Sequence, residues 1–412
     1  MRILLLAQWY PPIIGGEEGH VEALARTLST RGHRVSVATL WHPGLPRRET
    51  VDGVTIHRLQ GTVQRVTGLF ADPDRRSAPP FPDPETTLGL ARILRAERPD
   101  VVHAHNWLMH SWLPMRPIGG HVLVVTLHDY GLVCAKKNLI RKDALCEGPS
   151  LGRCLPCAGA HYGSAKGTLT VLATAAARPV VRRAVDMIVP VSDAVRRGVG
   201  LAADDPRVRV IPNFVQDPPP VDDEAAALMA GLPTRRFWLY VGALSRQKGI
   251  ATLLAAHARL ATGDPLVLIG YPASDMPPEI SQPPADVVVR FSWPRQAVLA
   301  AMERSLAVVV PSTWREPCPT VVLEAMTAGR PIVGSRIGGI PELVDDESAI
   351  LVDPGDADAL ADAMQRLADD PHLAASLGAA ARARAAAYRV DAVVPRIEAV
   401  YRELLNARGA TA

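Results

Sequence analysis

Short runs rich in Val, Ile and Leu alternate with helical or loop-like stretches in two separate series, and this alternation restricts the fold more than any other feature of the chain. Strand-like runs occur at residues 3–7, 34–40, 101–103, 122–127, 187–191 and 208–211 in the first series, and at 237–241, 266–269, 287–291, 307–311, 331–334 and 350–352 in the second. Strands that alternate with helices form parallel sheets covered on both faces. The sequence therefore predicts an α/β fold of two Rossmann-like, doubly wound domains.

The boundary between the two series lies near residues 216–220, where the sequence QDPPP breaks the pattern. A chain of 412 residues also exceeds what one hydrophobic core usually serves. We expect an N-terminal Rossmann-like domain over residues 1–216, a C-terminal one over 217–390, and a final helix over 391–412 that could pack back on the first domain.

Helical spacing of apolar residues predicts helices at 251–260 and 319–328, followed by an Ala-rich helical tail from about 360 to 405. Residues 71–84 form a Pro-rich loop without a packing pattern. In open parallel sheets, ligands bind at the carboxyl ends of the strands. Two such sheets that face each other would form a cleft lined by strand-end loops, and we expect the chemistry there.

The composition is that of a soluble globular protein, with 48% hydrophobic and 21% charged residues. No apolar run reaches the ~18 residues that span a bilayer, so we expect a cytoplasmic protein. Residues 1–216 hold 27 Lys and Arg against 18 Asp and Glu. This basic half suits peripheral contact with the inner membrane face or a phosphorylated acceptor, although ordinary solvated surface charge is the favoured explanation. We expect no nucleic-acid partner.

Two carboxylates stand eight positions apart in residues 311–326. Glu316 is expected just before a helix and Glu324 two turns along it. In a nucleotide-sugar site, one carboxylate would accept from sugar hydroxyls and the other from ribose hydroxyls. The alternative is that Glu316 caps the helix and Glu324 is a solvated charge.

The beginning of the same helix offers unpaired backbone amides to a diphosphate. Pro317 and Pro319 carry no N–H group, although Pro319 lines the expected site. The useful amides are therefore those of Cys318, Thr320 and Val321.

Four of the five cysteines crowd into an expected insertion over residues 131–160. Cys134, Cys146, Cys154 and Cys157 have the spacing Cys-x11-Cys-x7-Cys-x2-Cys. Four thiolates suit a tetrahedral structural zinc ion, with an iron–sulfur cluster as the second choice. Two disulfides, which a reducing cytoplasm disfavours, and free thiols are the remaining alternatives.

The segment EPCPTVVLEAM, followed by AGRPIVGSRIGGIPELV, resembles the E-x7-E region of the glycosyltransferase family 4 type. The stretches GGEEGHVEALARTLSTRGHRVSV, PDVVHAHN, VVTLHDY, VIPNF and VGALSRQKG are similar to the family in the same order, across roughly residues 1–355. The resemblance implies the GT-B fold. It also implies a retaining enzyme that moves a sugar from a nucleotide-sugar donor (UDP, GDP or another nucleoside diphosphate) to a hydroxyl group of an acceptor.

The resemblance also implies roles for single residues. Gly15 and Gly16 match the loop after the first strand, where backbone amides approach the donor diphosphate or the acceptor. His128 matches the family histidine beneath the transferred sugar, which stabilises the transition state. Lys248 matches the lysine that neutralises the leaving diphosphate, and with His128 and Glu316 it completes the expected catalytic set.

The chain departs from the family at Ala243, where an arginine usually follows the glycine. Arg246, in the same loop, is our candidate to replace that arginine. No catalytic metal is expected, because basic groups and the helix terminus supply the positive field. Trp293 and Phe291 would pack against the nucleobase, or simply belong to the core.

Several alternatives stay open at this point. His105 is a candidate acceptor contact, and the acceptor itself could be a glycan, a lipid or a natural product. A GT-B sugar-nucleotide epimerase would share the architecture. A degenerate, non-catalytic sugar-nucleotide- or metal-binding protein would explain Ala243 and the cysteines.

Overall fold

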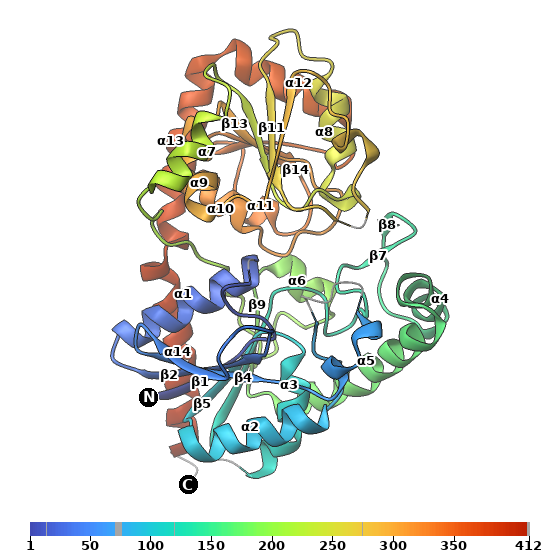
Figure 1. Cartoon of the computed structure of the whole chain (residues 1–412), viewed down its shortest axis with the longest axis vertical. Helices are drawn as coiled ribbons and strands as arrows, with labels where there is room; N and C mark the ends of the chain where they lie inside the picture. Colours follow the sequence, from blue (N-terminus) through green and yellow to red (C-terminus); the bar gives the residue numbers. More distant parts are fainter. Residues whose placement is uncertain (14, 71–75, 119, 274, 410–412) are drawn as a thin grey trace. The chain divides into compact units, whose positions relative to one another are not determined.

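The computed structural model describes residues 1–13, 15–70, 76–118, 120–273 and 275–409 (Figure 1). Its contacts divide the chain into two compact units. Unit 1 comprises Met1–Pro212 and Val390–Ala412, and unit 2 comprises Asn213–Arg389. The sequence placed the first boundary four residues later, after residue 216, and the final helix at residues 391–412.

A seven-stranded sheet forms the centre of unit 1 in the described residues, in the order β3-β4-β2-β1-β5-β6-β9. Its strands are β1 (Arg2–Leu6), β2 (Arg34–Leu40), β3 (Arg48–Val51), β4 (Val54–Leu59), β5 (Val101–Ala104), β6 (Val122–Leu127) and β9 (Met187–Pro190). β3 pairs with β4 antiparallel and the other neighbours pair in parallel. Every residue of β5 and β6 is buried, which explains their continuous apolar runs.

The helices of unit 1 are α1 (Gly16–Thr30), α2 (Pro84–Glu97), α3 (Leu108–Trp112), α4 (Leu151–Tyr162), α5 (Ser164–Ala184), α6 (Asp193–Gly198) and α14 (Val390–Gly409), with the short 3₁₀ helices η1 (Val63–Arg65), η2 (Thr67–Leu69) and η3 (Leu113–Ile118). Most of them lie between the strands of the unit, whereas α6 and α14 follow the last strand of its sheet. The chain leaves β1 toward β2 but leaves β4 toward β5 in the opposite direction along the sheet. Because such crossovers are right-handed, α1 and α2 cover opposite faces.

Unit 2 contains a six-stranded parallel sheet within the described residues, in the order β12-β11-β10-β13-β14-β15. Its strands are β10 (Trp238–Val241), β11 (Leu266–Gly270), β12 (Val287–Phe291), β13 (Ala307–Val310), β14 (Ile332–Ser335) and β15 (Ala349–Val352). Its helices are α7 (Asp223–Ala230), α8 (Ile250–His257), α9 (Arg295–Arg304), α10 (Thr320–Thr327), α11 (Ile340–Leu343), α12 (Ala357–Asp369) and α13 (Pro371–Ala385), with η4 (Arg246–Lys248), η5 (Pro278–Ile280) and η6 (Ala386–Tyr388). Figure 1 shows α8 and α12 on one side of this sheet and α7, α9 and α13 on the other. The predicted doubly wound fold is therefore confirmed.

The predicted strand at 208–211 was wrong. This segment runs beside β9 but forms a single bridge, between Val208 and Ile188. The N–H of Ile188 donates to the carbonyl of Arg207 at 2.7 Å. The next residue facing the same way is Pro190, which has no N–H to continue the ladder.

The predicted Ala-rich helical tail is divided into three α-helices, α12, α13 and α14. Asp370 caps α13 through its side chain, which accepts from the N–H of Leu373 at 2.9 Å, and Pro371 opens that helix. Because proline cannot continue the preceding helix, α12 ends at Asp369. Of the predicted loop at 71–84, residues 71–75 lie outside the described residues, and the remainder ends where Asp83 caps α2.

Among the helices of the described residues, none combines the length and the apolar composition that crossing a membrane requires. The expected contact with a membrane surface stays a prediction.

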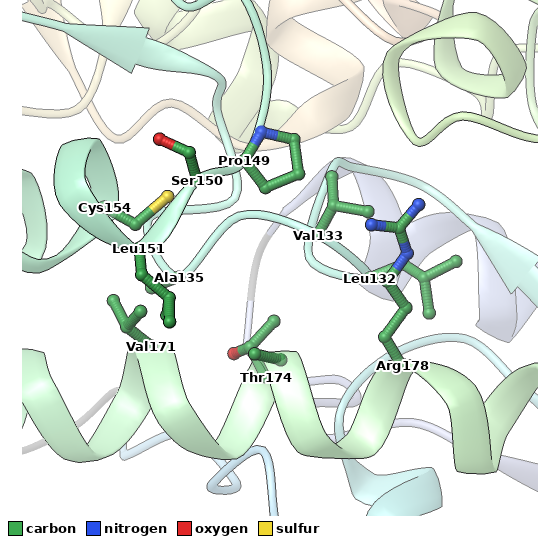
Figure 2. A pocket seen from close by; sticks show the side chains of 11 residues that line it. Leu132, Val133, Ala135, Pro149, Ser150, Leu151, Cys154, Val171, Thr174 and Arg178 are labelled. Carbon is green, nitrogen blue, oxygen red and sulfur yellow. The ribbon is translucent and has the colours of Figure 1, made fainter.

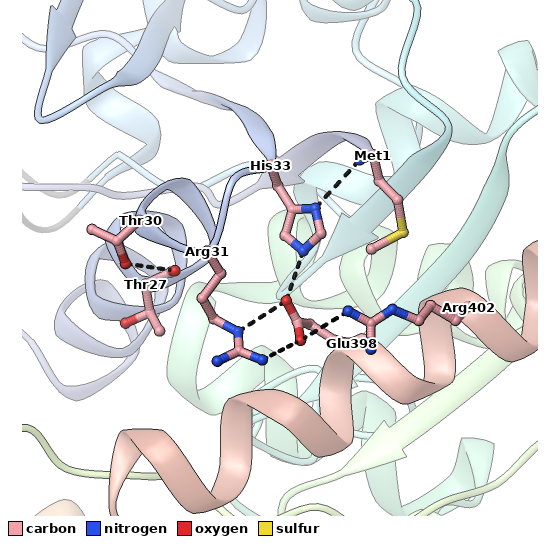
Figure 3. A network of polar contacts seen from close by, with 7 residues as sticks. All are labelled: Met1, Thr27, Thr30, Arg31, His33, Glu398 and Arg402. Carbon is pink, nitrogen blue, oxygen red and sulfur yellow. Dashed lines mark hydrogen bonds and ion pairs between the residues drawn. The ribbon is translucent and has the colours of Figure 1, made fainter.

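One buried carboxylate fastens α14 to the rest of unit 1 (Figure 3). Glu398 is 1% exposed. It accepts hydrogen bonds from Arg31 at 2.8 and 3.0 Å and lies 2.6 Å from Nε2 of His33. The hydrogen bonds from Arg31, followed by the contact with His33, lower the pKa of Glu398 to about 2 although burial opposes this.

We predict that Glu398→Gln lowers the free energy of unfolding by about 1–3 kcal/mol at pH 7, the range for hydrogen bonds to charged groups. An unfolded glutamate has a pKa of about 4.3. The stabilisation should therefore be complete above that pH and should vanish as the pH falls through about 2. Denaturant titration of both proteins at several pH values measures this difference. A difference that stays constant down to pH 2 would contradict the charged role of Glu398.

Candidate functional site

A buried ion pair joins the loops that follow β10 and β13 in unit 2. Lys248 Nζ lies 2.7 Å from Glu316 Oε1, and the Ser312 hydroxyl donates to the same oxygen at 2.5 Å. Glu316 is 3% exposed, so these donors stabilise a carboxylate that water hardly reaches. Both loops leave the carboxyl ends of parallel strands, which is where open α/β sheets bind ligands.

Glycines allow the backbone to approach this pair closely. Gly338 has φ +60°, and a Cβ atom there would collide with the backbone nitrogen and oxygen of Glu316. The neighbouring Gly339 N–H donates to the carbonyl of Glu316 at 2.7 Å. Gly249 has φ +77°, and a Cβ atom there would overlap the carbonyl oxygen of Pro311. The position of Glu316 therefore depends on glycine at both places.

Glu324 lies one turn into α10 rather than the predicted two, because the helix begins at Thr320. Its Oε1 lies 2.8 Å from Nη2 of Arg295, the first residue of α9. Burial raises the pKa of Glu324, and the guanidinium of Arg295 opposes that rise. Trp293, two residues before Arg295, is buried, whereas Phe291 at the end of β12 is 48% exposed.

The other predicted donor residues lie at the same edge of the unit 2 sheet. Cys318, Pro319, Thr320 and Val321 form the entry to α10, and Arg246 opens η4 after β10 with an exposed side chain. The carbonyl of Cys318 accepts a hydrogen bond from Asn213 at 2.8 Å. Ala243, which stands where the family has arginine, uses its carbonyl to accept from the Tyr240 hydroxyl at 2.7 Å.

In unit 1 the loop after β1 leads directly into α1. Gly15 precedes the helix in an extended conformation, and Gly16 is its first residue. A Cβ atom at Gly15 would collide with the carboxylate of Glu18, which is buried. Position 15 therefore requires glycine as long as the Glu18 side chain keeps this conformation.

Glu17 lies beside the loops that follow β5 and β6. Asn106 donates to its carboxylate, and the other end of the Asn106 side chain accepts from the N–H groups of Gln8 and Leu108, both at 3.1 Å. Burial, followed by the charges of Glu18 and Asp129, raises the pKa of Glu17 to about 8. Glu17 therefore holds a proton at neutral pH more readily than an ordinary glutamate.

His128, at the end of β6, is one of a group of close histidines. His105 Nδ1 lies 3.0 Å from His128 Nε2, and the ring of His20 packs edge-on against His128 with centroids 4.8 Å apart. Beneath them, His103 lies 2.6 Å from the Tyr401 hydroxyl of α14 and 2.7 Å from that of Thr126.

Burial and the neighbouring imidazoles hold the pKa of His20 and of His105 well below the ordinary value, and burial lowers that of His103 to about 3. These three side chains are therefore neutral at pH 7. His128 thus contacts imidazoles that carry no charge.

His20, His105 and His128 are also a group that could hold a metal ion, since their ligand atoms lie within 4.8 Å of one another. The four cysteines of residues 131–160 do not form such a group among the described residues. The contact between His105 and His128 already has the length of a hydrogen bond, so an imidazole pair explains it without a metal.

Two family models match consecutive parts of the chain. The model described as Glycosyltransferase Family 4 matches residues 14–217, and the model described as Glycosyl transferases group 1 matches residues 235–370. The chain is a GT-B glycosyltransferase of the family 4 type. An enzyme of this type takes its sugar from a nucleotide-sugar donor, as the sequence predicted.

Relatives match this glycosyltransferase over most of its length. Glycogen synthase of Mycobacterium tuberculosis is 29% identical over 419 residues, which cover 93% of this chain and 90% of that protein. Sucrose-phosphate synthase from Thermosynechococcus elongatus superposes with a TM-score of 0.75 at 23% identity, over 98% of this chain and 99% of that one. The Anabaena protein Alr3699/HepE, solved in complex with UDP and glucose, gives 0.70 at 19% identity, over 98% and 100%.

Several residues of the site escaped the sequence reasoning. Ser312 and Arg295 contact the predicted carboxylates, and Gly338 lies against the backbone of Glu316. In unit 1, Asn106 binds Glu17, whose pKa responds to the charge of Asp129, the residue after His128. Glu17 could have been found from the sequence. It directly follows Gly15 and Gly16, which mark the loop after the first strand, and ligands bind at the carboxyl ends of such strands. Arg295 could not have been found in this way, since its partner is 29 positions away in the sequence.

We predict that Gly338→Ala is more damaging than Gly355→Ala. Both glycines have positive φ, +60° and +84°, but no atom lies within 4 Å of a Cβ atom built at Gly355. Gly355→Ala should therefore cost only backbone strain, about 1–2 kcal/mol. Gly338→Ala should cost roughly 1–3 kcal/mol more through its collision with Glu316.

Chemical denaturation measures both losses. Equal losses of unfolding free energy in the two variants would show that Glu316 does not depend on close approach at Gly338.

Proposed function

We propose that this glycosyltransferase retains the anomeric configuration of its donor, that its donor is a UDP-hexose with UDP-glucose as the first candidate, and that it transfers to a hydroxyl group of a sugar-containing acceptor. The observation that carries the proposal is the buried pair of Lys248 and Glu316 at the strand ends of unit 2. This pair supplies a cation for a diphosphate and a carboxylate for sugar hydroxyls at one place.

Lys248 acts on the leaving group in this proposal. Its side chain is 25% exposed, so the ammonium group touches Glu316 and still reaches solvent. The remaining N–H groups of the ammonium would donate to diphosphate oxygens. They would compensate the negative charge that grows on the diphosphate as the glycosidic bond breaks. The amides of Thr320 and Val321 and the exposed Arg246 would add to this field.

The carboxylates of Glu316 and Glu324 would bind different parts of the donor. Glu316 would accept from hydroxyl groups of the transferred sugar, since it lies beside Lys248. Glu324 would accept from the ribose hydroxyl groups. Its partner Arg295 is half-exposed, so it can move aside and leave one carboxylate oxygen of Glu324 to the ligand. Trp293 or Phe291 would pack against the base.

Unit 1 supplies His128 and the acceptor contacts in this proposal. The neutral His105 fixes the ring of His128 through the 3.0 Å contact, so His128 can stabilise positive charge on the reacting sugar. A donor phosphate oxygen would take the acceptor proton on the face from which the nucleotide leaves. Retention follows from attack on that same face.

The names of similar proteins support the choice of donor. One relative is a glycogen synthase, and a protein of the same fold was solved in complex with UDP and glucose. Glucose and UDP are therefore the first sugar and nucleotide to test.

Transfer to a panel of sugar acceptors, with UDP-, GDP- and ADP-glucose as donors, tests the proposal. We expect turnover with UDP-glucose, and proton NMR of the isolated product should show an α-linkage, as in the donor. A β-linkage would contradict retention. Conversion of the donor without any acceptor would favour the epimerase.

The variant His128→Ala tests the role of His128 in the same assay. It should bind UDP as tightly as the wild-type enzyme but lose roughly 100-fold in transfer, the scale of losing one transition-state stabiliser. Wild-type turnover in this variant would remove His128 from the reaction.

A further inference from the structure

Residues 140–163, which contain three of the four cysteines, contribute a single buried apolar side chain, that of Ala158. A cluster of three small buried residues, Ala135, Ala158 and Val171, is joined there by the half-buried Cys154, Leu155 and Tyr162. Most residues from 141 to 153 are exposed. Segments too small to build a core of their own usually need a metal or a cross-link to stay folded.

This segment nevertheless has a defined course. A two-stranded hairpin, β7 (Ile140–Arg141) with β8 (Ala144–Leu145), turns through Lys142 and Asp143, which both have positive φ. Five residues separate this hairpin from the helix α4, which begins after the capping side chain of Ser150, whose oxygen accepts from the N–H of Arg153 at 3.4 Å. A hairpin followed by a helix is the element order here.

Two of the four cysteines, Cys154 and Cys157, lie on α4, whereas Cys146 follows the hairpin and Cys134 lies in the turn before it. Cys146 directly follows β8, and its N–H donates to the carbonyl of Leu139 at 2.7 Å. Cys157 Sγ lies 3.8 Å from the carbonyl of Ile140, the next residue. Cys146 and Cys157 therefore both border the start of β7.

Cys154 and Cys134 are related through the small apolar cluster. Cys154 lies three positions before Cys157 on α4, hence on the same helix face, and it packs against the cluster that contains Ala135, the neighbour of Cys134. The Tyr162 hydroxyl donates to the carbonyl of Ala135 at 3.0 Å, which ties the end of α4 to the Cys134 turn. Figure 2 shows Cys154 in the wall of a pocket of about 230 Å³ that Leu132 and Val133 also line.

The surroundings suit thiolates bound to a cation. The Gly148 N–H lies 3.5 Å from Cys146 Sγ, as a donor to a sulfur ligand would. A divalent cation would pair with each thiolate and so offset the repulsion between four neighbouring negative charges.

We propose that Cys134, Cys146, Cys154 and Cys157 bind one zinc ion, which fastens the β7–β8 hairpin and α4 to the loop after β6. Binding draws the four sulfurs to about 2.3 Å from the metal, and each bound thiol releases its proton. The metal acts structurally, because four protein ligands leave no open position for a substrate.

Metal analysis of the full chain tests the proposal. Protein made under reducing, anaerobic conditions in medium with both zinc and iron should contain about one zinc per chain. Each of the four single Cys→Ser variants should lose it. The matched control is Cys318→Ser, which changes the fifth cysteine, buried in unit 2, and should keep its zinc.

Two further measurements keep the test decisive if a serine variant fails to fold. Cys157→His should retain the zinc, because imidazole is a zinc ligand. Treatment of the wild-type chain with a strong chelator should release the zinc and open residues 131–163 to proteolysis, while unit 2 stays resistant.

Four results would overturn the proposal: no stoichiometric zinc, an iron–sulfur chromophore, disulfides under these conditions, or zinc that persists in all four serine variants. The last result would place the metal elsewhere, for example at His20, His105 and His128.

Discussion

The carboxylate of Glu316 is the group around which the loops at the carboxyl ends of β10 and β13 are arranged. A buried negative charge is costly unless it is paired, and Lys248 at 2.7 Å supplies the pairing charge. That contact requires the loops after β10 and β13 to meet, and the N–H of Thr313 accordingly donates to the carbonyl of Gln247 at 2.9 Å. The left-handed glycines Gly249 and Gly338 then permit the backbone approach that this geometry demands.

The same pair links the fold to the chemistry. In the proposed reaction the diphosphate becomes a second anionic partner of Lys248, so a lysine already oriented by Glu316 needs little reorganisation when the donor binds. Unit 1 shows a similar arrangement around His128, where neutral imidazoles rather than a charge fix the ring. Each unit thus carries, at the carboxyl ends of its strands, one oriented side chain to which the proposal gives a catalytic role.

Much of the fold followed from the sequence because buried parallel strands read as short apolar runs. Five of the six expected strands of unit 1, and all six of unit 2, lie within a residue or two of their predicted positions. The strands β3 and β4 were both missed. The residues of β3, Arg48–Val51, are mostly exposed and polar, and an edge strand of this kind leaves no apolar pattern. In β4, Val54–Leu59, buried residues alternate with partly exposed ones, so the strand has no continuous apolar run. The failure at 208–211 came from a missing N–H group at Pro190, which hydrophobicity does not reveal.

The site was predictable to the extent that its residues lie within continuous motifs. Glu316, Lys248 and His128 belong to recognisable stretches, and the structure places each at a strand end. Arg295 and Ser312 owe their contacts to tertiary packing between separate elements, and a single sequence does not display such pairings. Burial, which shifts the pKa of Glu17 to about 8, likewise appears only in three dimensions.

The role of Lys248 is tested most directly by comparing UDP and uridine in calorimetric titrations of the wild-type enzyme and Lys248→Met. Methionine keeps much of the length of the side chain but removes its charge. We expect the variant to bind UDP at least tenfold more weakly, a loss of about 1.4 kcal/mol, and to bind uridine as the wild-type enzyme does. Unchanged affinity for UDP, or equal losses for UDP and uridine, would contradict the assignment of Lys248 to the donor diphosphate.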